Sequence, residues 1–460
     1  MDNVIKTPTG CTRRLHTMRV LAVGGGGREH AIVEALARSD AEIYACMKNN
    51  NPGIARRVKD SLLVDEKDVA KVVEYAVSRD VALAVVGPEA PLEVGIADAL
   101  ERAGVPTASP SMSAARIETS KSFMRGMMQR RGLPGCVRHV VAETVDDVKH
   151  ALDELGEQVV VKPTGLTGGK GVKVYGEHMT SRADVIEYAE EILSKKIGGT
   201  SQMVVEEKLV GEEFTLQAFC DGRTVVPMPA VQDHKRAFEG DTGPNTGGMG
   251  SYSMGDGLLP FLRRTDYVDA VDIMKKVVDT MRDEDMMYKG ALYGQFMLTK
   301  DGPKVIEFNA RFGDPEAMNV LSLIDSDFVD VCEKMASGGL SDADVHFMDK
   351  ATVCKYVVPE GYGVKSIAGE RMLVDEKAIA DEGAVLYYAN VDSKDGVVYT
   401  TSSRSAGVVG IADSIEGAEE IAERAIGHIS GRLSVRHDIG KRHVLDARVR
   451  HMEELRGEVR

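Results

Sequence analysis

Tryptophan is absent from the chain, and aromatic residues make up only 5% of its 460 positions. Cysteine is scarce too, at six residues: Cys11, Cys46, Cys136, Cys220, Cys332 and Cys354. They form no Cys-x-x-Cys pair and no His/Cys cluster with zinc-site spacing, which argues against a disulfide scaffold and a structural zinc site. This cysteine usage is typical of a reducing compartment, so we expect a cytoplasmic protein.

Long hydrophobic runs and an excess of basic residues are also missing. No apolar stretch approaches the ~20 residues needed to span a bilayer. The formal net charge of −15 disfavours binding to nucleic acid or to an anionic membrane, because both are polyanions. Residues 1–17 contain basic residues but no apolar segment, so we expect a flexible extension rather than a secretory signal.

The length of the chain predicts about two to four domains. From Arg19 to about Ala108, strand-like runs alternate with amphipathic helical stretches, which is typical of an α/β unit with a parallel sheet. Residues 137–207 are expected to form a second unit of four strands and two helices. Capping boxes are predicted to open these helices, Thr144 with Asp147 and Ser181 with Asp184.

Beyond this unit the sequence predicts a long loop over residues 232–253 and a helix near 264–284. A hairpin follows, GALYGQFMLT-KDGP-KVIEFNA, with its turn near Asp301. After about residue 348 the composition changes to short strands and one helix, from about 415 to 430. We therefore expect a separate α+β domain at the carboxyl end.

Four glycines at 24–27 follow the strand-like run VLAV and precede a helical stretch. A dinucleotide fingerprint needs glycine at its first, third and sixth positions, but the sixth position from Gly24 is Glu29. The acidic residue expected about 20 positions later is also missing, since Tyr44 to Lys48 contains none. We therefore expect one phosphate at the helix amino terminus in place of NAD; a purely structural turn is the alternative.

A second glycine-rich segment, VVVKPTGLTGGKGVKV, joins two predicted strands. It differs from the phosphate loop GxxxxGK[ST], which opens a helix, because Lys162 lies on a strand here. A loop between two strands can fold over a phosphate chain as a lid. Taken alone, the same segment is equally an ordinary solvated turn.

The predicted hairpin carries a set of oxygen ligands. Glu307 and Asn309 are two residues apart on a strand and therefore project from one face. The hairpin places Gln295 roughly opposite Glu307, on the same face. Three oxygen ligands on one sheet suit Mg²⁺, although an exposed polar strand face is the alternative.

The loop that contains GPNTGG at 243–248 offers free backbone amides, and DHKR at 233–236 adds two cations beside it. Combined with the lid and the oxygen ligands, these segments indicate phosphoryl transfer. Lysines hold the nucleotide phosphates, a divalent metal bridges them, and a basic clamp receives the acceptor.

Several motifs carry a family resemblance. VKPTGLTGGKG, VVEEKLVGEEF and VIEFN resemble the ATP-grasp superfamily. With GGGGREHA, VGPEAPL, QDHKR, DTGPNTGGMGSYS and VIEFNARFGDPE, the chain resembles the phosphoribosylamine-glycine ligase family from Met18 to about residue 442. This resemblance implies that ATP phosphorylates the carboxylate of glycine and that the amine of 5-phosphoribosylamine then displaces phosphate. No protein nucleophile is needed, which agrees with the absence of a GxSxG motif.

The resemblance also implies an architecture of α/β and α+β domains. After the extension at 1–17, we expect a Rossmann-like amino-terminal substrate domain at 18–118. The ATP-grasp core is expected at 119–136 and 208–347, its lid subdomain at 137–207, and the α+β domain at 348–460. The expected small molecules are ATP, glycine and 5-phosphoribosylamine, with Mg²⁺ or Mn²⁺, in a monomer or weak dimer.

Site residues follow from the same resemblance. The expected ATP ligands are Lys121, Lys162, Gly168, Gly169, Lys170, Gly171, Glu206, Glu207, Leu209 and Glu213. The expected ligands of glycine and the amine substrate are Gly26, Gly27, Arg28, Pro88, Glu89, Asp233, Lys235, Arg236, Gly247, Gly248, Met249 and Gly250. The expected metal ligands are Gln295, Glu307 and Asn309, and Arg311 and Lys235 are the expected catalytic residues.

The chain departs from the family pattern in four places: Gly25 replaces an Asn, Thr164 replaces a lid Asp, Ala310 replaces a Cys, and NNNPGI stands for the usual PGN. None of these changes removes a metal or phosphate ligand. The alternatives are another ATP-grasp carboxylate-amine ligase, a non-catalytic nucleotide-binding protein and, weakest, an NAD oxidoreductase.

Overall fold

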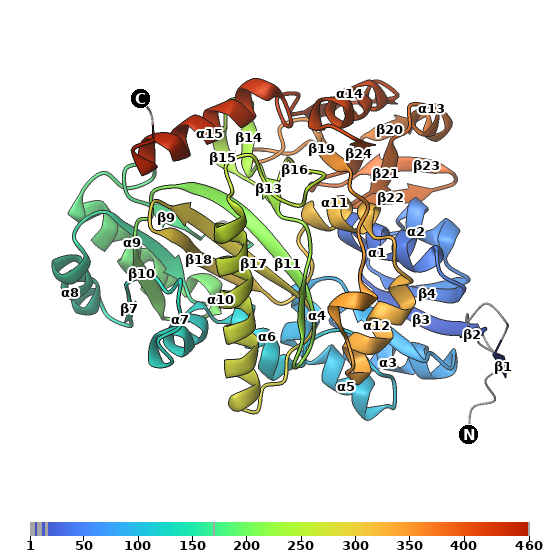
Figure 1. Cartoon of the computed structure of the whole chain (residues 1–460), viewed down its shortest axis with the longest axis horizontal. Helices are drawn as coiled ribbons and strands as arrows, with labels where there is room; N and C mark the ends of the chain where they lie inside the picture. The colour runs from blue at the N-terminus through green and yellow to red at the C-terminus, as the bar shows by residue number, and fades with distance from the viewer. Residues whose placement is uncertain (1–4, 7–11, 14–16, 169–170, 459–460) are drawn as a thin grey trace.

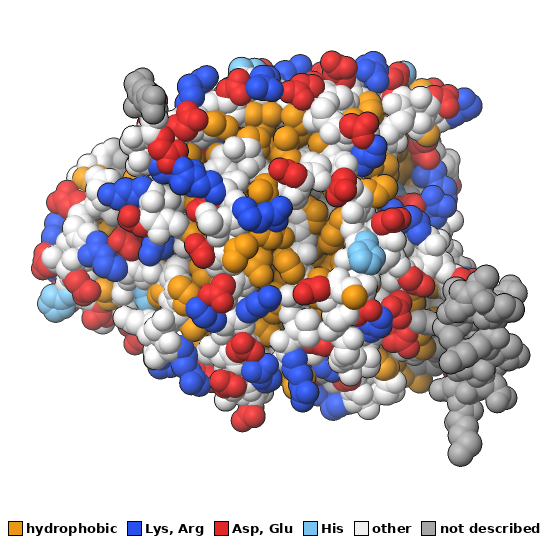
Figure 2. All heavy atoms as spheres, viewed as in Figure 1, with side chains coloured by type: hydrophobic (Ala, Val, Ile, Leu, Met, Phe, Trp, Pro, Cys, Tyr) orange, Lys and Arg blue, Asp and Glu red, His pale blue; other side chains and the backbone are white. Residues whose placement is uncertain are grey.

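The computed structural model describes residues 5–6, 12–13, 17–168 and 171–458 (Figure 1). Most of the extension expected at 1–17 lies outside this range; two short strands in it, β1 (Ile5–Lys6) and β2 (Thr12–Arg13), pair antiparallel. None of the described helices has the length and apolarity that crossing a membrane requires. Figure 2 shows acidic and basic side chains interspersed over one face, with no large patch of a single sign.

The amino-terminal unit is the expected parallel α/β structure. Its sheet has the order β5-β4-β3-β6, with all pairs parallel. The strands are β3 (Met18–Val23), β4 (Ala41–Met47), β5 (Asp60–Leu63) and β6 (Leu83–Val86). The helices are α1 (Gly27–Ala37), α2 (Pro52–Arg57), α3 (Val69–Ser78), α4 (Glu89–Glu93) and α5 (Ile96–Arg102). Val20 to Val23 are fully buried, as in a parallel sheet covered on both faces.

Two helices, α6 (Met112–Thr119) and α7 (Lys121–Arg130), lead into a small antiparallel sheet of order β7-β10-β8-β9. Its elements are β7 (His139–Ala142), α8 (Val145–Leu155), β8 (Val159–Pro163), β9 (Lys173–Val174), α9 (Arg182–Lys195), η1 (Ile197–Gly199) and β10 (Met203–Glu207). Both predicted capping boxes are confirmed, Thr144 with Asp147 and Ser181 with Asp184. This unit packs its own hydrophobic core, separate from the main one, and we call it the lid.

The central sheet has the order β18-β17-β11-β13-β16-β19-β24-β21, with β12 and β26 attached at the side. Its strands are β11 (Glu212–Asp221), β12 (Val225–Pro227), β13 (Val231–Asp233), β16 (Gly250–Ser253), β17 (Lys289–Thr299), β18 (Gly302–Asn309), β19 (Ala351–Pro359), β21 (Val385–Tyr388), β24 (Ala406–Ala412) and β26 (Leu433–Val435). Its helices include α10 (Arg264–Asp283), α11 (Glu316–Leu323) and α12 (Phe328–Ser337), with the short η2 (Asp342–Asp344) after them. The sheet runs without a break past residue 348, because β16 pairs with β19.

The carboxyl-terminal part adds a second sheet of order β22-β23-β20-β25 and three helices. These elements are β20 (Arg371–Val374), α13 (Glu376–Asp381), β22 (Val391–Lys394), β23 (Val397–Thr400), α14 (Ile415–Ile426), β25 (Ile429–Ser430) and α15 (Arg442–Arg456). The sequence predicted only α14. It missed α13, which is six residues long, and α15, in which only Leu445 and Met452 are buried. An apolar stripe that sparse is a weak helical signal.

The long loop predicted over residues 232–253 is wrong. It contains a small hairpin, β14 (Arg236–Phe238) and β15 (Thr242–Asn245), and then β16. Gly240 and Asp241 have positive φ and turn the chain between the two short strands. The strands are too short, and too rich in glycine and proline, to show an alternating pattern in the sequence.

Asn51 joins the amino-terminal unit to the carboxyl-terminal part. Its side chain is fully buried and caps α2 by accepting hydrogen bonds from the backbone of Gly53 and Ile54. Its amide nitrogen lies 2.9 Å from the backbone oxygens of both Gly25 and Tyr388. The NNNPGI segment, a departure from the family pattern, therefore contributes an interdomain contact next to the first glycine turn.

We expect Asn51→Ala to lower the free energy of unfolding by about 2–4 kcal/mol, because it removes a helix cap and leaves buried carbonyls unpaired. Thermal and denaturant unfolding measure the change. The matched control is Asn49→Ala, which removes an exposed contact with Asn390 in the same segment and should cost less than about 1 kcal/mol. Equal costs for the two variants would contradict this account of Asn51.

Candidate active site

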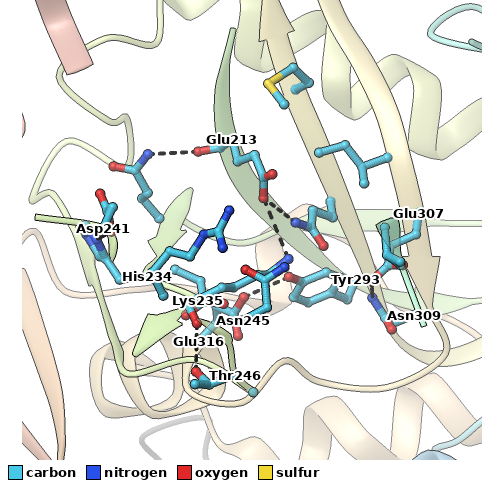
Figure 3. Close-up of a pocket in the computed structure, with 18 of the residues that line it drawn as sticks. Glu213, His234, Lys235, Asp241, Asn245, Thr246, Tyr293, Glu307, Asn309 and Glu316 are labelled. Atoms are coloured by element: carbon cyan, nitrogen blue, oxygen red, sulfur yellow. Dashed lines mark hydrogen bonds and ion pairs between the residues drawn. The ribbon is translucent and has the colours of Figure 1, made fainter. Parts of the chain in front are cut away.

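A cavity of about 460 Å³ lies between the lid, the central sheet and the β14–β15 hairpin (Figure 3). Its volume is within the range of small-molecule sites. Many residues predicted from the sequence line it: Lys162, Gly168, Glu213, Asp233, Lys235, Arg236, Gly247, Gln295, Glu307, Asn309 and Arg311. Gly169 and Lys170 fall outside the described residues. The structure thus brings together segments that are more than 140 positions apart.

The other predicted nucleotide and glycine-loop residues lie around the cavity but do not line it. They are Lys121, Gly171, Glu206, Glu207, Leu209, Gly248, Met249 and Gly250. Lys121 contacts the lid loop, with its backbone N–H donating to the Thr164 oxygen at 3.0 Å. The Gly171 oxygen accepts a hydrogen bond from the Tyr188 hydroxyl. Glu207 pairs with Arg138, and the half-buried Leu209 follows shortly after it.

The predicted metal ligands lie together on the β17–β18 hairpin. Gln295 pairs directly with Glu307, as the sequence predicts, and Asn309 follows two residues later on the same face. The Asn309 amide nitrogen lies 3.5 Å from Glu307 Oε1. Desolvation disfavours the charge of Glu307, but Lys121, Lys235 and Lys162 outweigh it and hold its pKa below the usual range.

This donor set fits Mg²⁺ or Mn²⁺, since it offers one ionised carboxylate and two amide oxygens, the ligand types that these ions prefer. In the described part of the chain no group of three His, Cys, Asp or Glu side chains is arranged to bind a metal. The hairpin set is different in kind, because two of its three donors are amides.

Lys162 is buried and belongs to a charge cluster between the lid and the core. Its Nζ lies 2.8 Å from Glu206 Oε2, and Glu206 also accepts two hydrogen bonds from Arg125. Burial alone would raise the pKa of Glu206, but Arg125 and Lys162 lower it to about 2. Both carboxylate oxygens of Glu206 are therefore occupied by Arg125 and Lys162.

Arg311 occupies the centre of a second charge cluster, which the sequence predicted only in part. Its guanidinium reaches Glu89 Oε2 at 3.3 Å, Glu118 Oε1 at 3.1 Å and Asn309 Oδ1 at 3.3 Å. Glu118 was not predicted from the sequence, since a single carboxylate in the helical stretch ARIETS does not indicate a functional site. Burial raises the pKa of Glu118 to about 7, against the lowering effect of Arg311.

Around Lys235, the cavity combines a cation with several carboxylates (Figure 3). Lys235 Nζ lies 3.7 Å from Glu213 Oε2, and this carboxylate also accepts a hydrogen bond from Gln295 at 2.6 Å. The carboxylates of Glu213 and Glu307 outweigh desolvation and raise the pKa of Lys235. Desolvation and the nearby Glu316 raise the pKa of Asp233.

Arg236, a predicted substrate ligand, makes two contacts within the protein. It forms an ion pair with Glu177 of the lid, and it donates a hydrogen bond to the Gly243 oxygen at 3.0 Å. Glu177 and Arg236 both line the cavity. The pair therefore connects the lid to the β14–β15 hairpin across the cavity.

A second cavity, of about 250 Å³, lies at the first glycine turn. Four predicted residues line it: Gly26, Gly27, Arg28 and Pro88. Arg404, which was not predicted from the sequence, also lines this cavity and pairs with Asp314 Oδ2 at 3.2 Å. Its short segment TTSSRSAG carries no recognisable motif. Asp314 lines both cavities, so the two sites meet at this residue.

Glu29 accounts for the departure from the dinucleotide fingerprint. Its carboxylate accepts a hydrogen bond from the backbone N–H of Gly26 at 2.7 Å and another from Arg28 at 2.6 Å. A Cβ added to Gly87 would lie 2.1 Å from Glu29 Oε1. The carboxylate thus lies against the turn and occupies one of its backbone amides, and Arg28 and Arg404 line the cavity beside it.

Models of the phosphoribosylglycinamide synthetase family match the chain in order along its length. The N domain matches residues 18–118, the ATP-grasp (A) domain matches 119–317 and the C domain matches 352–442. The phosphoribosylamine-glycine ligase of Methanothermobacter thermautotrophicus is 53% identical over 439 residues, which is 95% of this chain and 100% of that protein. The Pyrococcus abyssi protein of the same name is 48% identical, over 95% of this chain and 98% of its own length.

Solved structures agree with this assignment. The phosphoribosylamine-glycine ligase of Thermotoga maritima superposes with a TM-score of 0.78 at 27% identity, over 92% of this chain and 100% of that one. The biotin carboxylase domain of the Hydrogenobacter thermophilus 2-oxoglutarate carboxylase shares the fold alone, with a TM-score of 0.72, 17% identity and coverage of 95% and 98%. From the three domain matches and the identity over nearly its whole length, the chain belongs to the phosphoribosylglycinamide synthetase family.

Proposed function

We propose that the chain ligates glycine to 5-phosphoribosylamine in an ATP-dependent reaction of purine biosynthesis, giving glycinamide ribonucleotide, ADP and phosphate. Relatives that carry the ligase name are 53% and 48% identical over nearly their full lengths. The structural observation that carries the proposal is the pair of cavities that meet at Asp314, because a ligase must bring an activated acid and an amine together.

We assign ATP and glycine to the larger cavity. Lys162 faces the nucleotide phosphates from the lid, and Glu213 and the backbone that follows Glu206 hold the nucleoside. Gln295, Glu307 and Asn309 would hold Mg²⁺ or Mn²⁺, which supplies charge neutralisation for the phosphates when bound. Lys235 would bind the carboxylate of glycine, and Asp233 would accept a hydrogen bond from its amino group.

The amine substrate belongs to the smaller cavity, where Arg28, Arg404 and the start of α1 favour its phosphate. Arg311, between Asn309 and Glu89, steadies the phosphoryl group as it passes from ATP to the glycine carboxylate. The amine nitrogen then attacks the acyl carbon. A C–N bond forms, the C–O bond to phosphate breaks, and the nitrogen gives up one proton.

The cysteines support direct transfer without a protein acyl intermediate. Cys46, Cys220, Cys332 and Cys354 are buried, and desolvation raises the pKa of each thiol, to about 12 for Cys46. A thiol of this kind is a poor nucleophile at neutral pH. An acyl phosphate supplies its own leaving group.

The remaining proposals rest on composition. A net charge of −15 and cysteines without a disulfide pattern support a cytoplasmic enzyme that acts on small molecules and not on nucleic acid or membranes. We also propose a monomer or weak dimer. A different ATP-grasp ligase or a nucleotide-binding protein without activity stays the alternative, and the first test separates all three.

The proposed reaction predicts that ADP forms only when ATP, Mg²⁺, glycine and freshly generated 5-phosphoribosylamine are all present. Coupled detection of ADP, together with mass spectrometry of the product, measures this requirement. Omission of either glycine or the amine is the control. Sustained turnover when formate or bicarbonate replaces glycine would point to another ligase, and no turnover with any acid would indicate a protein that only binds nucleotide.

Glu307→Gln should reduce kcat by about 100-fold or more, because it removes the one carboxylate among the three proposed metal ligands. Steady-state rates over a Mg²⁺ titration measure the loss, and the titration midpoint should move to higher concentration. Asp301→Asn, at the exposed tip of the same hairpin, is the matched control and should keep the parent rate. Parent-like activity in Glu307→Gln would refute the metal assignment.

Glu177→Gln should raise KM for ATP by about 2–5-fold with a smaller change in kcat, because it weakens the ion pair that holds the lid against the β14–β15 hairpin. Initial-rate kinetics measure both constants. The control is Glu157→Gln, which replaces another lid carboxylate, one that accepts a hydrogen bond from the Tyr175 hydroxyl at 3.1 Å. If Arg236 instead binds substrate by itself, Glu177→Gln will leave KM for ATP unchanged.

A further inference from the structure

The helix α15 places one of its side chains in the larger cavity. The match to the family's C domain ends at residue 442, where α15 begins, so the rest of this helix lies beyond the matched domains. Arg448, on the second turn of the helix, is among the residues that line the cavity. Figure 1 shows α15 running along the edge of the molecule above β14 and β15.

Arg448 connects two carboxylates from different elements. Its Nη1 donates to Glu212 Oε2 at 2.9 Å, and its Nη2 forms an ion pair with Asp241. Glu212 begins β11, and Asp241 lies in the turn of the β14–β15 hairpin. One guanidinium therefore holds together the strand and the hairpin that form two walls of the cavity.

The Glu212 carboxylate depends on α15 for its charge partners. The side chain is only 3% exposed, and its second oxygen is hydrogen bonded to His451 of the same helix. Burial raises the pKa of Glu212, while Arg448 and His451 oppose this effect. Glu213, the next residue along β11, is the proposed nucleoside ligand and contacts Gln295 and Lys235.

Asp241 connects Arg448 to the other wall. Its Oδ1 accepts a hydrogen bond from Arg436 at 2.8 Å and faces His234 Nδ1 at 3.4 Å. His234 is 2% exposed and lies between Asp233 and Lys235, the residues proposed to bind glycine. Asp241 therefore links Arg448 on α15 to His234, which belongs to the segment that carries Lys235.

We propose that Arg448 is a positioning residue of the nucleotide and glycine site, which acts by fixing Glu212 and Asp241 and through them Glu213 and Lys235. The proposal rests on the proposed function only in taking ATP as the ligand of the larger cavity. In this view α15 is part of the active-site wall, and the long separation of Arg448 from the other site residues hides this role in the sequence.

The test compares Arg448→Gln with Arg448→Lys, and uses Arg456→Gln as the matched control. Arg456 lies on the same helix and pairs with Asp266 at 2.7 Å, away from the residues that line the cavity. Equilibrium binding of ATP is measured by calorimetry on the full chain without glycine or amine. KM, kcat and the thermal midpoint are measured in parallel.

Arg448→Gln should weaken ATP binding and raise KM for ATP by about 5–20-fold, with a smaller loss of kcat. The reason is that Glu213 and Lys235 would no longer be held in the positions that bind the substrates. Arg448→Lys should recover part of the affinity. Arg456→Gln should lower the thermal midpoint and leave the ATP affinity and KM for ATP unchanged. Asp241→Asn, which keeps the shape of the hairpin turn, should also weaken ATP binding and raise KM for ATP. It replaces Arg448→Gln in the test if that variant does not fold.

Two outcomes overturn the proposal: unchanged ATP affinity in Arg448→Gln and Asp241→Asn, or an equal loss of affinity in Arg456→Gln. The second outcome would mean that α15 acts only through overall stability. A parent chain that binds ATP but ligates no glycine would refute the proposed function, while the binding comparison would still decide the role of Arg448.

Discussion

The site depends on charge pairing away from water. A cavity that receives ATP must present cations, and a desolvated cation is costly unless a carboxylate lies beside it. Four cations of the described site have such a partner: Glu206 for Lys162, Glu213 for Lys235, Glu118 and Glu89 for Arg311, and Glu212 and Asp241 for Arg448. In these pairs six carboxylates face four cations, so the site has no surplus of positive charge before any substrate arrives. An incoming phosphate competes with carboxylates for cations that are already held in place.

These pairs also determine how the parts of the chain fit together, because the partners come from different units. Arg125 on α7, Glu206 on β10 and Lys162 on β8 join the core to the lid. Arg311, after β18, reaches Glu89 at the start of α4 in the amino-terminal unit. The groups that set up the electrostatics of the site are thus the same groups that connect its walls, so a change in one alters both charge and geometry.

The sequence predicted the parts of this arrangement that depend on local pattern. The register of the β17–β18 hairpin follows from its short turn, and so Gln295 was correctly placed opposite Glu307. The capping boxes of α8 and α9 are equally local. Glu118, Arg404 and Arg448 were missed, because each is a single charged residue whose role comes from partners 90 to more than 200 positions away. The β14–β15 hairpin was missed because its strands are too short to show periodicity.

The meeting of the two cavities explains why two glycine turns are needed and why they differ. At the first, the Glu29 carboxylate occupies the backbone amide of Gly26, and the cavity beside it is the proposed site for the phosphate of the amine substrate. The second lies in the lid, where the sequence predicts that it covers the phosphate chain of ATP. Arg311 contacts Asn309 on one side and Glu89 on the other, so it lies between the proposed metal ligands and the amine site. If Arg311 and the two cavities act as proposed, the phosphoryl group is delivered next to the place where the amine binds, and the acyl phosphate need not leave the protein before it reacts.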